Sequence, residues 1–206
     1  MRQTLIVMVK EPRPGRVKTR LARDIGTTAA AWWFRHQTRA LLRRLRDPRW
    51  QIVLAVAPDR AGLASRAWPA GLPRRAQGQG DLGTRMARQL RAAAPGRACV
   101  IGADIPGITR AHIARAFAAL GTHDLVFGPA HDGGYWLVGG HPQRLPRGLF
   151  ANVRWSTHHA LADTIASAPA ARVALTDTLA DIDTAADLAA HRATPRVFPD
   201  DRAPGA

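Results

Sequence analysis

The sequence is poor in cysteine, tyrosine, lysine and glutamate, and it has no long apolar run. Its single cysteine, Cys99, rules out an intramolecular disulfide and is typical of proteins that work in a reducing compartment. No run reaches the roughly 18 apolar residues that a membrane helix needs, and the N-terminus lacks a signal-peptide pattern. We therefore expect a cytoplasmic protein that does not insert into a membrane.

The rare charged residue types occur together in one short segment. The chain has two lysines, Lys10 and Lys18, and one glutamate, Glu11, whereas every other basic residue is arginine. Lysine is a compact point charge on a flexible stem, so its use in this segment alone favours contact with a phosphate. The alternatives are chance, or lysines that are simply solvated.

Basic residues outnumber acidic ones by 30 to 15, which gives a formal net charge of +15. Such a charge suits nucleic acids, but the arginines are spread along the chain and aromatic residues make up only 6%. Several arginines fall on one predicted helix, as on a solvated face. They include Arg39, Arg43, Arg44 and Arg46. We expect no specific nucleic acid as partner, because small acidic substrates such as nucleotides fit the charge equally well.

Short apolar strands alternate with helical patterns, which predicts an α/β fold with a mostly parallel, doubly wound sheet. We predict one domain over residues 1–193 and a flexible tail over 194–206. We expect helices to begin at Thr27 or Thr28, at Thr109, and at Ser156 or Thr157. The predicted strands are 4–9, 51–56, 98–102, 124–127, 135–138 and 172–175; the predicted helices are 27–46, 84–94, 109–120, 156–166 and a short one after Thr184; residues 61–80 read as a loop.

The loop that follows the first strand, residues 10–20, is the clearest candidate for ligand binding. A strand, a Pro/Gly loop and a helix in this order bind phosphate in open α/β proteins, because backbone N–H groups and the helix N-terminus point at the ligand. Basic side chains add charge-assisted contacts to a polyphosphate. In this loop they are Lys10, Arg13, Arg16, Lys18 and Arg20.

Three further segments place carboxylates after predicted strands, where open α/β sheets bind their ligands. Asp104 is a natural anchor for Mg²⁺ or Mn²⁺, although it could instead stabilise the turn before Pro106. Asp181 and Asp183 point the same way if their segment is extended, so either could be a second metal ligand. Both could instead belong to a helix cap.

The third segment, around Asp132, is a candidate for the acceptor side of a site. Paired glycines, Gly133 and Gly134, let the backbone approach a ligand closely, although a tight turn would explain them as well. Asp132 could accept hydrogen bonds from a hydroxyl or act as a base. Asp81, at a Gly-rich helix entry, could bind a ribose or simply cap its helix. The further substrate-side candidates are Tyr135, Trp155 and Ser156.

Five segments, taken in order, resemble a bacterial family of GT-A-fold transferases. This family is known as a domain of unknown function and as the glycosyltransferase-like "radical SAM/selenodomain-associated transferase" family. The resemblance runs from the first strand to about Leu188. The segments are Lys10-x-Pro12-x-Pro14-Gly15-x-Val17-Lys18-Thr19-Arg20-Leu21, Gly80-Asp81-Leu82-Gly83-x-Arg85-Met86, Gly102-x-Asp104-Ile105-Pro106-Gly107, Gly128-Pro129-Ala130-x-Asp132-Gly133-Gly134-Tyr135 and Trp155-Ser156-Thr157.

The resemblance implies a nucleotide-diphospho-sugar transferase fold and kinship with phospholactate and molybdenum-cofactor guanylyltransferases. It implies that Asp104 holds the metal and that the Asp181 to Thr184 turn matches an acidic turn of several relatives. Many GT-A glycosyltransferases carry Asp-x-Asp at the metal position, whereas this chain reads Ala103-Asp104-Ile105, which looks more like a nucleotidyltransferase. The residues implied for the nucleotide and its phosphates are Lys10, Arg13, Pro14, Gly15, Lys18, Arg20, Asp81 and Gly83.

These observations lead to a hypothesis of metal-dependent transfer from a nucleotide-activated donor. Glycosyl transfer from a nucleotide sugar to a small acceptor is the leading form, and NTP-dependent nucleotidyl transfer with release of pyrophosphate is the alternative. In either form, Lys18 and Arg20 would stabilise the departing phosphate and Asp132 would face the acceptor. The remaining alternative is a protein that binds a nucleotide or polyanion without catalysis. The chain could also form a homodimer.

Overall fold

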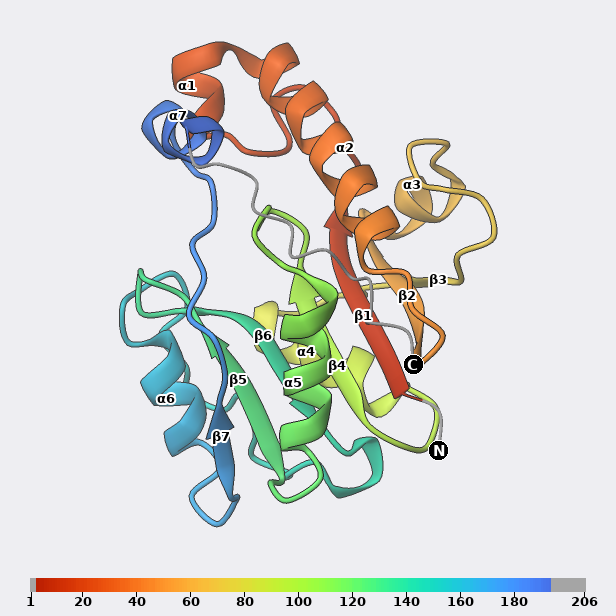
Figure 1. Ribbon diagram of the computed structural model, residues 1–206, viewed down its shortest axis with the longest axis vertical. Coiled ribbons are helices and arrows are strands. Elements are labelled where there is room, and N and C mark those ends of the chain that lie inside the picture. Colours follow the sequence, from red (N-terminus) through yellow and green to blue (C-terminus); the bar gives the residue numbers. More distant parts are fainter. Residues whose placement is uncertain (1–2, 194–206) are drawn as a thin grey trace, which may run out of the picture.

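The computed structural model describes residues 3–193, and the predicted tail 194–206 lies outside the described residues. Its centre is a seven-stranded sheet with the order β3-β2-β1-β4-β6-β5-β7 (Figure 1). The strands are β1 Gln3–Lys10, β2 Trp50–Ala57, β3 Arg74–Ala76, β4 Ala98–Gly102, β5 Leu125–Pro129, β6 Tyr135–Gly140 and β7 Val173–Leu175. The helices are α1 Leu21–Ile25, α2 Thr27–Arg44, α3 Asp59–Ala64, α4 Leu82–Arg91, α5 Arg110–Ala119, α6 Ala160–Ala166 and α7 Ala185–Ala193, with a 3₁₀ turn η1 at Pro142–Arg144.

The sheet is mostly parallel, as the sequence predicts. Strand β1 runs parallel to both of its neighbours, β2 and β4, and the β2–β3 and β5–β7 pairs are parallel too. Only β6 runs the other way among the described strands, between β4 and β5. It can do so because a tight turn joins it to β5, closed by the Ala130 N–H donating to the Gly134 carbonyl at 3.0 Å.

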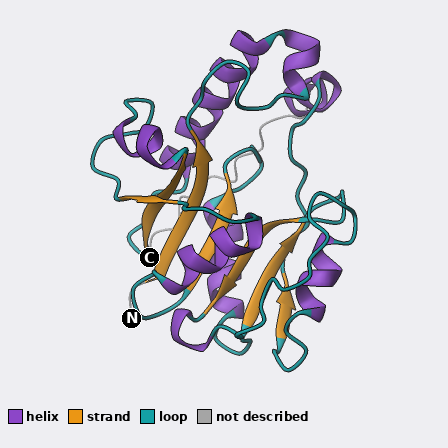
Figure 2. Ribbon diagram, turned by 180° about the vertical axis from the view of Figure 1, so that it is seen from behind, coloured by secondary structure: helices purple, strands orange, loops and turns teal. Residues whose placement is uncertain are grey.

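Helices cover both faces of the sheet (Figure 2). Alternating side chains of β1 fill two separate cores, one on each face. Leu5 and Val7 pack in the core that includes residues of α2 and α5, such as Leu41 and Phe117. Ile6 packs on the opposite face with residues of α4 and α6. A buried strand covered on both faces has to be apolar throughout, which explains its uninterrupted apolar run. The doubly wound fold is thus confirmed.

Several local predictions were wrong. The segment 61–80 is not all loop, because it contains the end of α3 and the three-residue edge strand β3, which is too short to show an alternating pattern. The short helix α1 was not predicted. Thr27 and Thr28 do not cap α2, since Gly26 holds the capping position with a φ of 85°. Helix α6 begins at Ala160 rather than at Ser156 or Thr157. Thr109 does cap α5, with its hydroxyl accepting from the His112 N–H.

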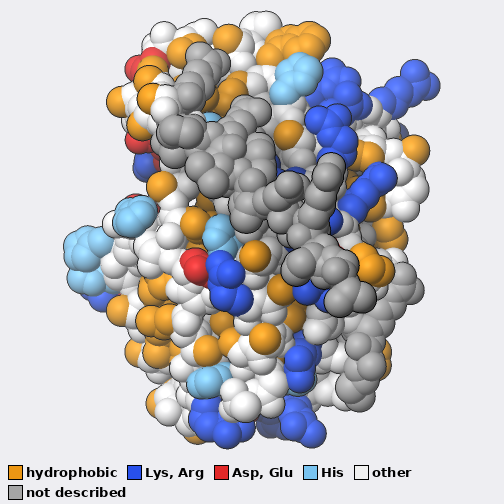
Figure 3. All heavy atoms as spheres, in the orientation of Figure 1, with side chains coloured by type: hydrophobic (Ala, Val, Ile, Leu, Met, Phe, Trp, Pro, Cys, Tyr) orange, Lys and Arg blue, Asp and Glu red, His pale blue; other side chains and the backbone are white. Residues whose placement is uncertain are grey.

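The prediction of a solvated arginine face on α2 was wrong for two of its residues. Arg39 donates to the Ala67 carbonyl at 3.0 Å, and Arg44 donates to the carbonyls of Pro106 and Ile108 at 2.6 and 2.7 Å. Both guanidinium groups therefore tie loops to the helix. Figure 3 shows Lys and Arg side chains at several separate places on this face of the molecule.

No helix within residues 3–193 is both long and apolar enough to cross a membrane.

Gly128 of β5 leaves room for the indole ring of Trp136 on β6, so an added methyl group should destabilise the protein. A Cβ at position 128 would clash with the ring of Trp136, which is 3% exposed. We expect Gly128→Ala to lower the free energy of unfolding by about 1–3 kcal/mol, as overpacking of a core does. Urea unfolding followed by tryptophan fluorescence measures this effect, and labelling of the buried Cys99 thiol provides a second probe.

The matched control is Gly107→Ala, where an added Cβ would meet only Leu179, at an ordinary 4.0 Å. This variant should change the free energy of unfolding by less than about 0.5 kcal/mol. Equal stability of the two variants would contradict the packing argument.

Candidate active site

Lys18 is the centre of the polar cluster at the carboxyl edge of the sheet. Its ammonium group donates to Asp104 Oδ2 and to Asp183 Oδ1, each at 2.8 Å. The Lys18 side chain is only 7% exposed, and its backbone has a φ of 46°, in the left-handed region that non-glycine residues rarely adopt. Such a conformation persists where its surroundings enforce it, and here it accompanies a side chain that two carboxylates hold.

The charge on Lys18 is stabilised by its partners. Burial alone would lower the pKa of Lys18, but the interactions with Asp104 and Asp183 outweigh it, so the pKa lies above its usual value of 10.5. Arg20 adds a second cation, with Nη1 donating to Asp183 Oδ2 at 2.9 Å, while its side chain stays 71% exposed. Asp183 thus bridges both basic residues.

The topology of the sheet explains how these residues meet. Lys18 follows β1 and Asp104 follows β4, which are adjacent parallel strands. The chain passes from β1 to β2 on one side and from β4 to β5, beyond β6, on the other. The carboxyl ends of β1 and β4 therefore flank the place where such sheets bind ligands. Arg44 fixes the segment after β4 by binding the carbonyls of Pro106 and Ile108.

Asp181 and Asp183 reach the same place from the C-terminal part of the chain. Leu179 forms a parallel bridge with Ala130 that extends the edge of the sheet. Beyond it the side chains alternate: Ile182, 3% exposed, packs with Leu21 and Leu188, and the two carboxylates face the site. The segment is anchored again at α7, where Asp187 accepts from the N–H groups of Asp183 and Thr184.

Three carboxylates of this cluster suit a divalent cation. One oxygen from each of Asp104, Asp181 and Asp183 lies within 4.8 Å of the others, the only such group within the described part of the chain. Carboxylate oxygens are the ligands that Mg²⁺ and Mn²⁺ prefer. Burial and the charge of Asp183 raise the pKa of Asp181, with Lys18 partly opposing them. The donor set therefore fits the ion, which would share Asp104 and Asp183 with Lys18.

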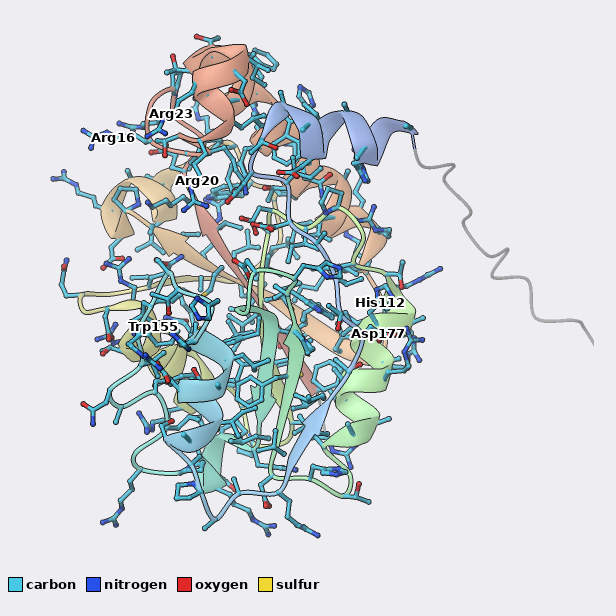
Figure 4. The ribbon with its side chains drawn as sticks, turned by 90° about the vertical axis from the view of Figure 1, so that its left-hand side faces the viewer. Arg16, Arg20, Arg23, His112, Trp155 and Asp177 are labelled. Atoms are coloured by element: carbon cyan, nitrogen blue, oxygen red, sulfur yellow. The ribbon has the colours of Figure 1, made fainter. Side chains whose placement is uncertain are left out.

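A cavity of about 610 Å³ opens beside this cluster and is rich in positive charge. It runs from the end of β1 across β4 and along α4. Figure 4 shows Arg16 and Arg20 at the upper part of this side of the molecule. The basic residues that line the cavity are Lys10, Arg16, Lys18, Arg20 and Arg85, and its acidic residues are Asp104 and Asp183.

A smaller cavity of about 240 Å³ lies on the other side of Asp104. The two cavities share six residues, all of which lie in or next to α4, β4 and β6: Leu82, Met86, Gly102, Asp104, Tyr135 and Trp136. Asp132, Asp181, Trp155 and Ser156 line the smaller cavity alone. Asp104 is thus the carboxylate common to both spaces.

The two aromatic side chains of the small cavity are fixed by their polar groups. The Tyr135 hydroxyl lies 3.3 Å from the Thr164 hydroxyl, and burial raises the pKa of Tyr135 well above its usual value. The Trp155 indole N–H donates to Asp81 Oδ2 at 3.1 Å. Both residues therefore offer ring surface to the cavity, and the phenol is a poor base near neutral pH.

Gly83 and Gly133 have packing roles. A Cβ on Gly83 would lie 2.6 Å from both the Trp155 ring and the Phe150 side chain. Gly133 has a φ of 82°, and a Cβ there would clash with the His158 backbone. Both glycines thus allow the 150–158 segment to pack close to the site, whatever they contribute to a ligand.

The structure brings together most but not all of the predicted site residues. Beyond the three clustered carboxylates, six of the predicted residues line the larger or the smaller cavity through charged or aromatic side chains: Lys10, Lys18, Arg20, Asp132, Tyr135 and Trp155. Gly134 lines the smaller cavity through its backbone. Ser156 also lines the smaller one. Neither cavity is lined by Arg13, Pro14, Gly15, Asp81, Gly83 or Gly133.

Two of these residues have other partners. Arg13 pairs with Glu11 at 2.7 Å, so the lone glutamate neutralises an arginine of its own loop. Asp81 caps α4, accepting from the Thr84 N–H at 2.8 Å, which is the alternative that the sequence left open. Contacts of these residues with a ligand stay predictions.

Arg16, which the sequence places among the basic side chains of the loop, lines the larger cavity. Arg85 and Gln77 line it as well but were not among the predicted site residues. The charge of Arg85, at the Gly-rich helix entry, was the available signal. Gln77 gave none. Its side-chain amide donates to the carbonyls of Val9 and Ala55 at 3.2 and 2.9 Å, and that bridge between strands is visible only in three dimensions.

The fold and this site define an α/β protein of the nucleotide-diphospho-sugar transferase type. The chain belongs to the bacterial family described as "Uncharacterized protein conserved in bacteria (DUF2064)", whose model matches residues 40–157. The resemblance seen in the sequence is thereby confirmed. The matched range includes Asp104 and most of the residues that line the small cavity, but not the loop of residues 10–20 or the Asp181–Asp183 turn.

Solved structures share the fold over nearly the whole chain. An inferred nucleotide-diphospho-sugar transferase from Desulfovibrio desulfuricans G20 is 26% identical, with a TM-score of 0.83 over 97% of this chain and 90% of that one. A nucleotidyl transferase from Methanothermobacter has 14% identity and a TM-score of 0.56 over 93% and 96% of the two chains. A Mycobacterium tuberculosis H37Rv protein in complex with manganese has 15% identity and a TM-score of 0.53 over 92% and 97%. No curated protein matches the sequence.

The ion pairs of Lys18 should make the stability of the fold depend on pH above the usual lysine range. Replacement by Lys18→Met removes the ammonium and should lower the free energy of unfolding by about 2 kcal/mol at neutral pH. A raised pKa in the folded state means that this contribution is complete below the unfolded pKa of 10.5 and is lost as the pH rises through the folded value. The difference between wild type and variant should therefore shrink above pH 10.5.

Urea unfolding of both proteins across this pH range measures the effect. Lys10→Met, which removes the exposed lysine of the same loop, is the control and should cost less than about 0.5 kcal/mol. A difference between wild type and Lys18→Met that stays constant with pH would contradict the assignment.

Proposed function

We propose that the protein is a transferase that uses a nucleotide-activated donor, with glycosyl transfer from a nucleotide sugar as its reaction. The observation that carries the proposal is Lys18, buried at the base of the basic cavity and held by Asp104 and Asp183. The likeness to the Desulfovibrio protein supports it over nearly the full chain.

The larger cavity suits the nucleotide diphosphate. Its basic side chains can meet several phosphate oxygens, and the exposed Arg20 is free to turn from Asp183 toward a ligand. In glycosyl transfer an acceptor hydroxyl attacks the anomeric carbon, the bond from that carbon to the β-phosphate oxygen breaks, and the nucleoside diphosphate leaves. Lys18 and Arg20 would stabilise the negative charge that develops on the leaving phosphate.

The smaller cavity suits the acceptor. Asp132 is the candidate base for the proton of the attacking hydroxyl. Its Oδ1 accepts from the Gly134 N–H at 2.9 Å, which orients the carboxylate and leaves its second oxygen available. The Tyr135 hydroxyl is a poor alternative, because Thr164 engages it and its pKa is raised.

Asp104, Asp181 and Asp183 would hold Mg²⁺ or Mn²⁺. A fold neighbour in complex with manganese is compatible with this choice. Bound there, the ion would neutralise phosphate charge beside the leaving group. Lys18 would then give up part of its contact with Asp104 and Asp183 and offer its ammonium to the phosphates of the larger cavity.

Nucleotidyl transfer is the second candidate, and the single carboxylate directly after β4 favours it. Gly102 stands two residues before Asp104 and Pro106 two residues after it, so neither position completes an Asp-x-Asp motif. In this reaction the acceptor oxygen attacks the α-phosphorus of an NTP, the α–β bridging bond breaks, and pyrophosphate leaves. The same basic side chains would stabilise the departing charge.

The test is calorimetric titration with nucleotide sugars and NTPs of each base, with and without Mn²⁺, followed by product analysis. Arg20→Gln should weaken nucleotide binding by about 10-fold or more, because it removes a charge-assisted hydrogen bond to the phosphates. Arg115→Gln is the matched control, at an exposed arginine that pairs with Asp177 and lines neither cavity, and should change affinity by less than about twofold.

The products separate the two reactions. Release of a nucleoside diphosphate supports glycosyl transfer, whereas pyrophosphate release from an NTP moves the assignment to nucleotidyl transfer. Binding without turnover would indicate a nucleotide binder. Equal effects of the two arginine variants, or no binding across the whole panel, would contradict the proposed site.

A further inference from the structure

The two cavities that meet at Asp104 carry opposite charge. Five basic residues line the larger cavity against two acidic ones. The smaller cavity is lined by three aspartates, Asp104, Asp132 and Asp181, and no lysine, arginine or histidine of the described chain lines it. A donor and an acceptor bound side by side would therefore meet very different electrostatic surroundings.

Basic side chains near the smaller cavity are turned to other partners. Arg154, next to Trp155, donates through Nε and Nη2 to the two oxygens of Asp163 at 2.8 and 2.9 Å. Lys18 contacts Asp104 from the side of the larger cavity. The rings of His158 and His159 lie against each other, 3.7 Å apart, and neither lines the cavity. Lys18 thus offsets the charge of Asp104 from the side of the larger cavity, and no cationic side chain of the described residues lines the smaller cavity beside Asp132 and Asp181.

Asp132 would keep this charge even with a cation in the acidic cluster. The cluster that fits a divalent ion consists of Asp104, Asp181 and Asp183 and does not include Asp132. The ion would offset the charge of its own ligands and of the donor phosphates, but Asp132 would still face the small cavity.

The remaining walls suit a molecule with both hydroxyl groups and apolar faces. Trp155 and Tyr135 present ring surface, with centroids 6.5 Å apart and an interplanar angle of 64°. Their polar groups are already bound to Asp81 and Thr164, so the rings can pack against C–H faces or a cation but add no strong donor. Carboxylates, in contrast, accept hydrogen bonds from hydroxyl or ammonium groups.

We propose that the smaller cavity binds the acceptor and selects a hydroxylated molecule that is neutral or positively charged, such as a sugar or an amino sugar, and rejects anionic acceptors. The assignment of the cavity to the acceptor rests on the proposed function. Its charge selectivity rests on the lining side chains alone, because like charges brought together at a binding site are strongly unfavourable.

Three hexoses of similar shape and different charge test the proposal: glucose, glucosamine and glucuronate. Saturation-transfer NMR on the full chain, with a nucleoside diphosphate in the same sample, should show glucose and glucosamine binding at least about tenfold more tightly than glucuronate. Asp132→Asn keeps an acceptor for the Gly134 N–H and should narrow the preference for glucosamine over glucuronate. Ser156→Lys, which adds a cation to the lining, should improve glucuronate binding.

The control is Asp124→Asn, which removes an exposed carboxylate just before the start of β5. Asp132 follows the other end of that strand, so this variant should leave the order of the three hexose affinities unchanged. Glucuronate binding as tightly as glucosamine, no binding of any hexose, or an order that neither cavity variant alters would overturn the proposal. Nucleotide signals in the same sample report separately on the larger cavity, so their absence would count against the proposed function and not against the charge selectivity.

Discussion

The contact of one ammonium group with two carboxylates holds the site of this protein together. Lys18 binds Asp104 and Asp183 at the same distance of 2.8 Å, and these three residues come from the first, middle and last parts of the chain. A buried lysine left without its partners, or the carboxylates left without the lysine, would carry an uncompensated charge, so the three segments stabilise one another.

The same contact divides the space at the edge of the sheet. On the side of Lys18 the lining is basic, and on the side of Asp132 it is acidic. Asp104 stands in both linings. A transferase needs this kind of division, because its donor and acceptor must meet at one reacting bond without exchanging places. The acidic lining of the smaller cavity is not apparent from the net charge of the chain, because arginines elsewhere dominate the formal charge of +15.

Much of the site could be predicted from the sequence because it depends on local order. The apolar runs fix the strands, and their carboxyl ends fix which loops can meet. The alternation of Asp181 and Asp183 predicts two carboxylates that point the same way, and the structure places both in one cluster, with Ile182 between them buried. The choice of lysine at position 18, in a chain that otherwise uses arginine, correctly draws attention to the residue at the centre.

Interactions between distant segments could not be predicted in this way. The sequence presents Lys18 as a phosphate ligand, whereas its contacts with two carboxylates require the segments around Asp104 and Asp183 to reach the loop that follows the first strand. Arg44 looks like a solvated helix residue until its bonds to Pro106 and Ile108 are seen. Strand β3 is short and lies at the edge of the sheet, so its pairing with β2 defines it rather than its composition.

The most direct test of this account is a crystal structure of the protein with Mn²⁺ and the nucleoside diphosphate that binds most tightly. The account predicts phosphates in the larger cavity within hydrogen-bonding reach of Lys18 and Arg20, with the ion held by Asp104 and at least one of Asp181 and Asp183. A nucleotide in the smaller cavity, or Lys18 still bound to both carboxylates with no ion beside them, would contradict it.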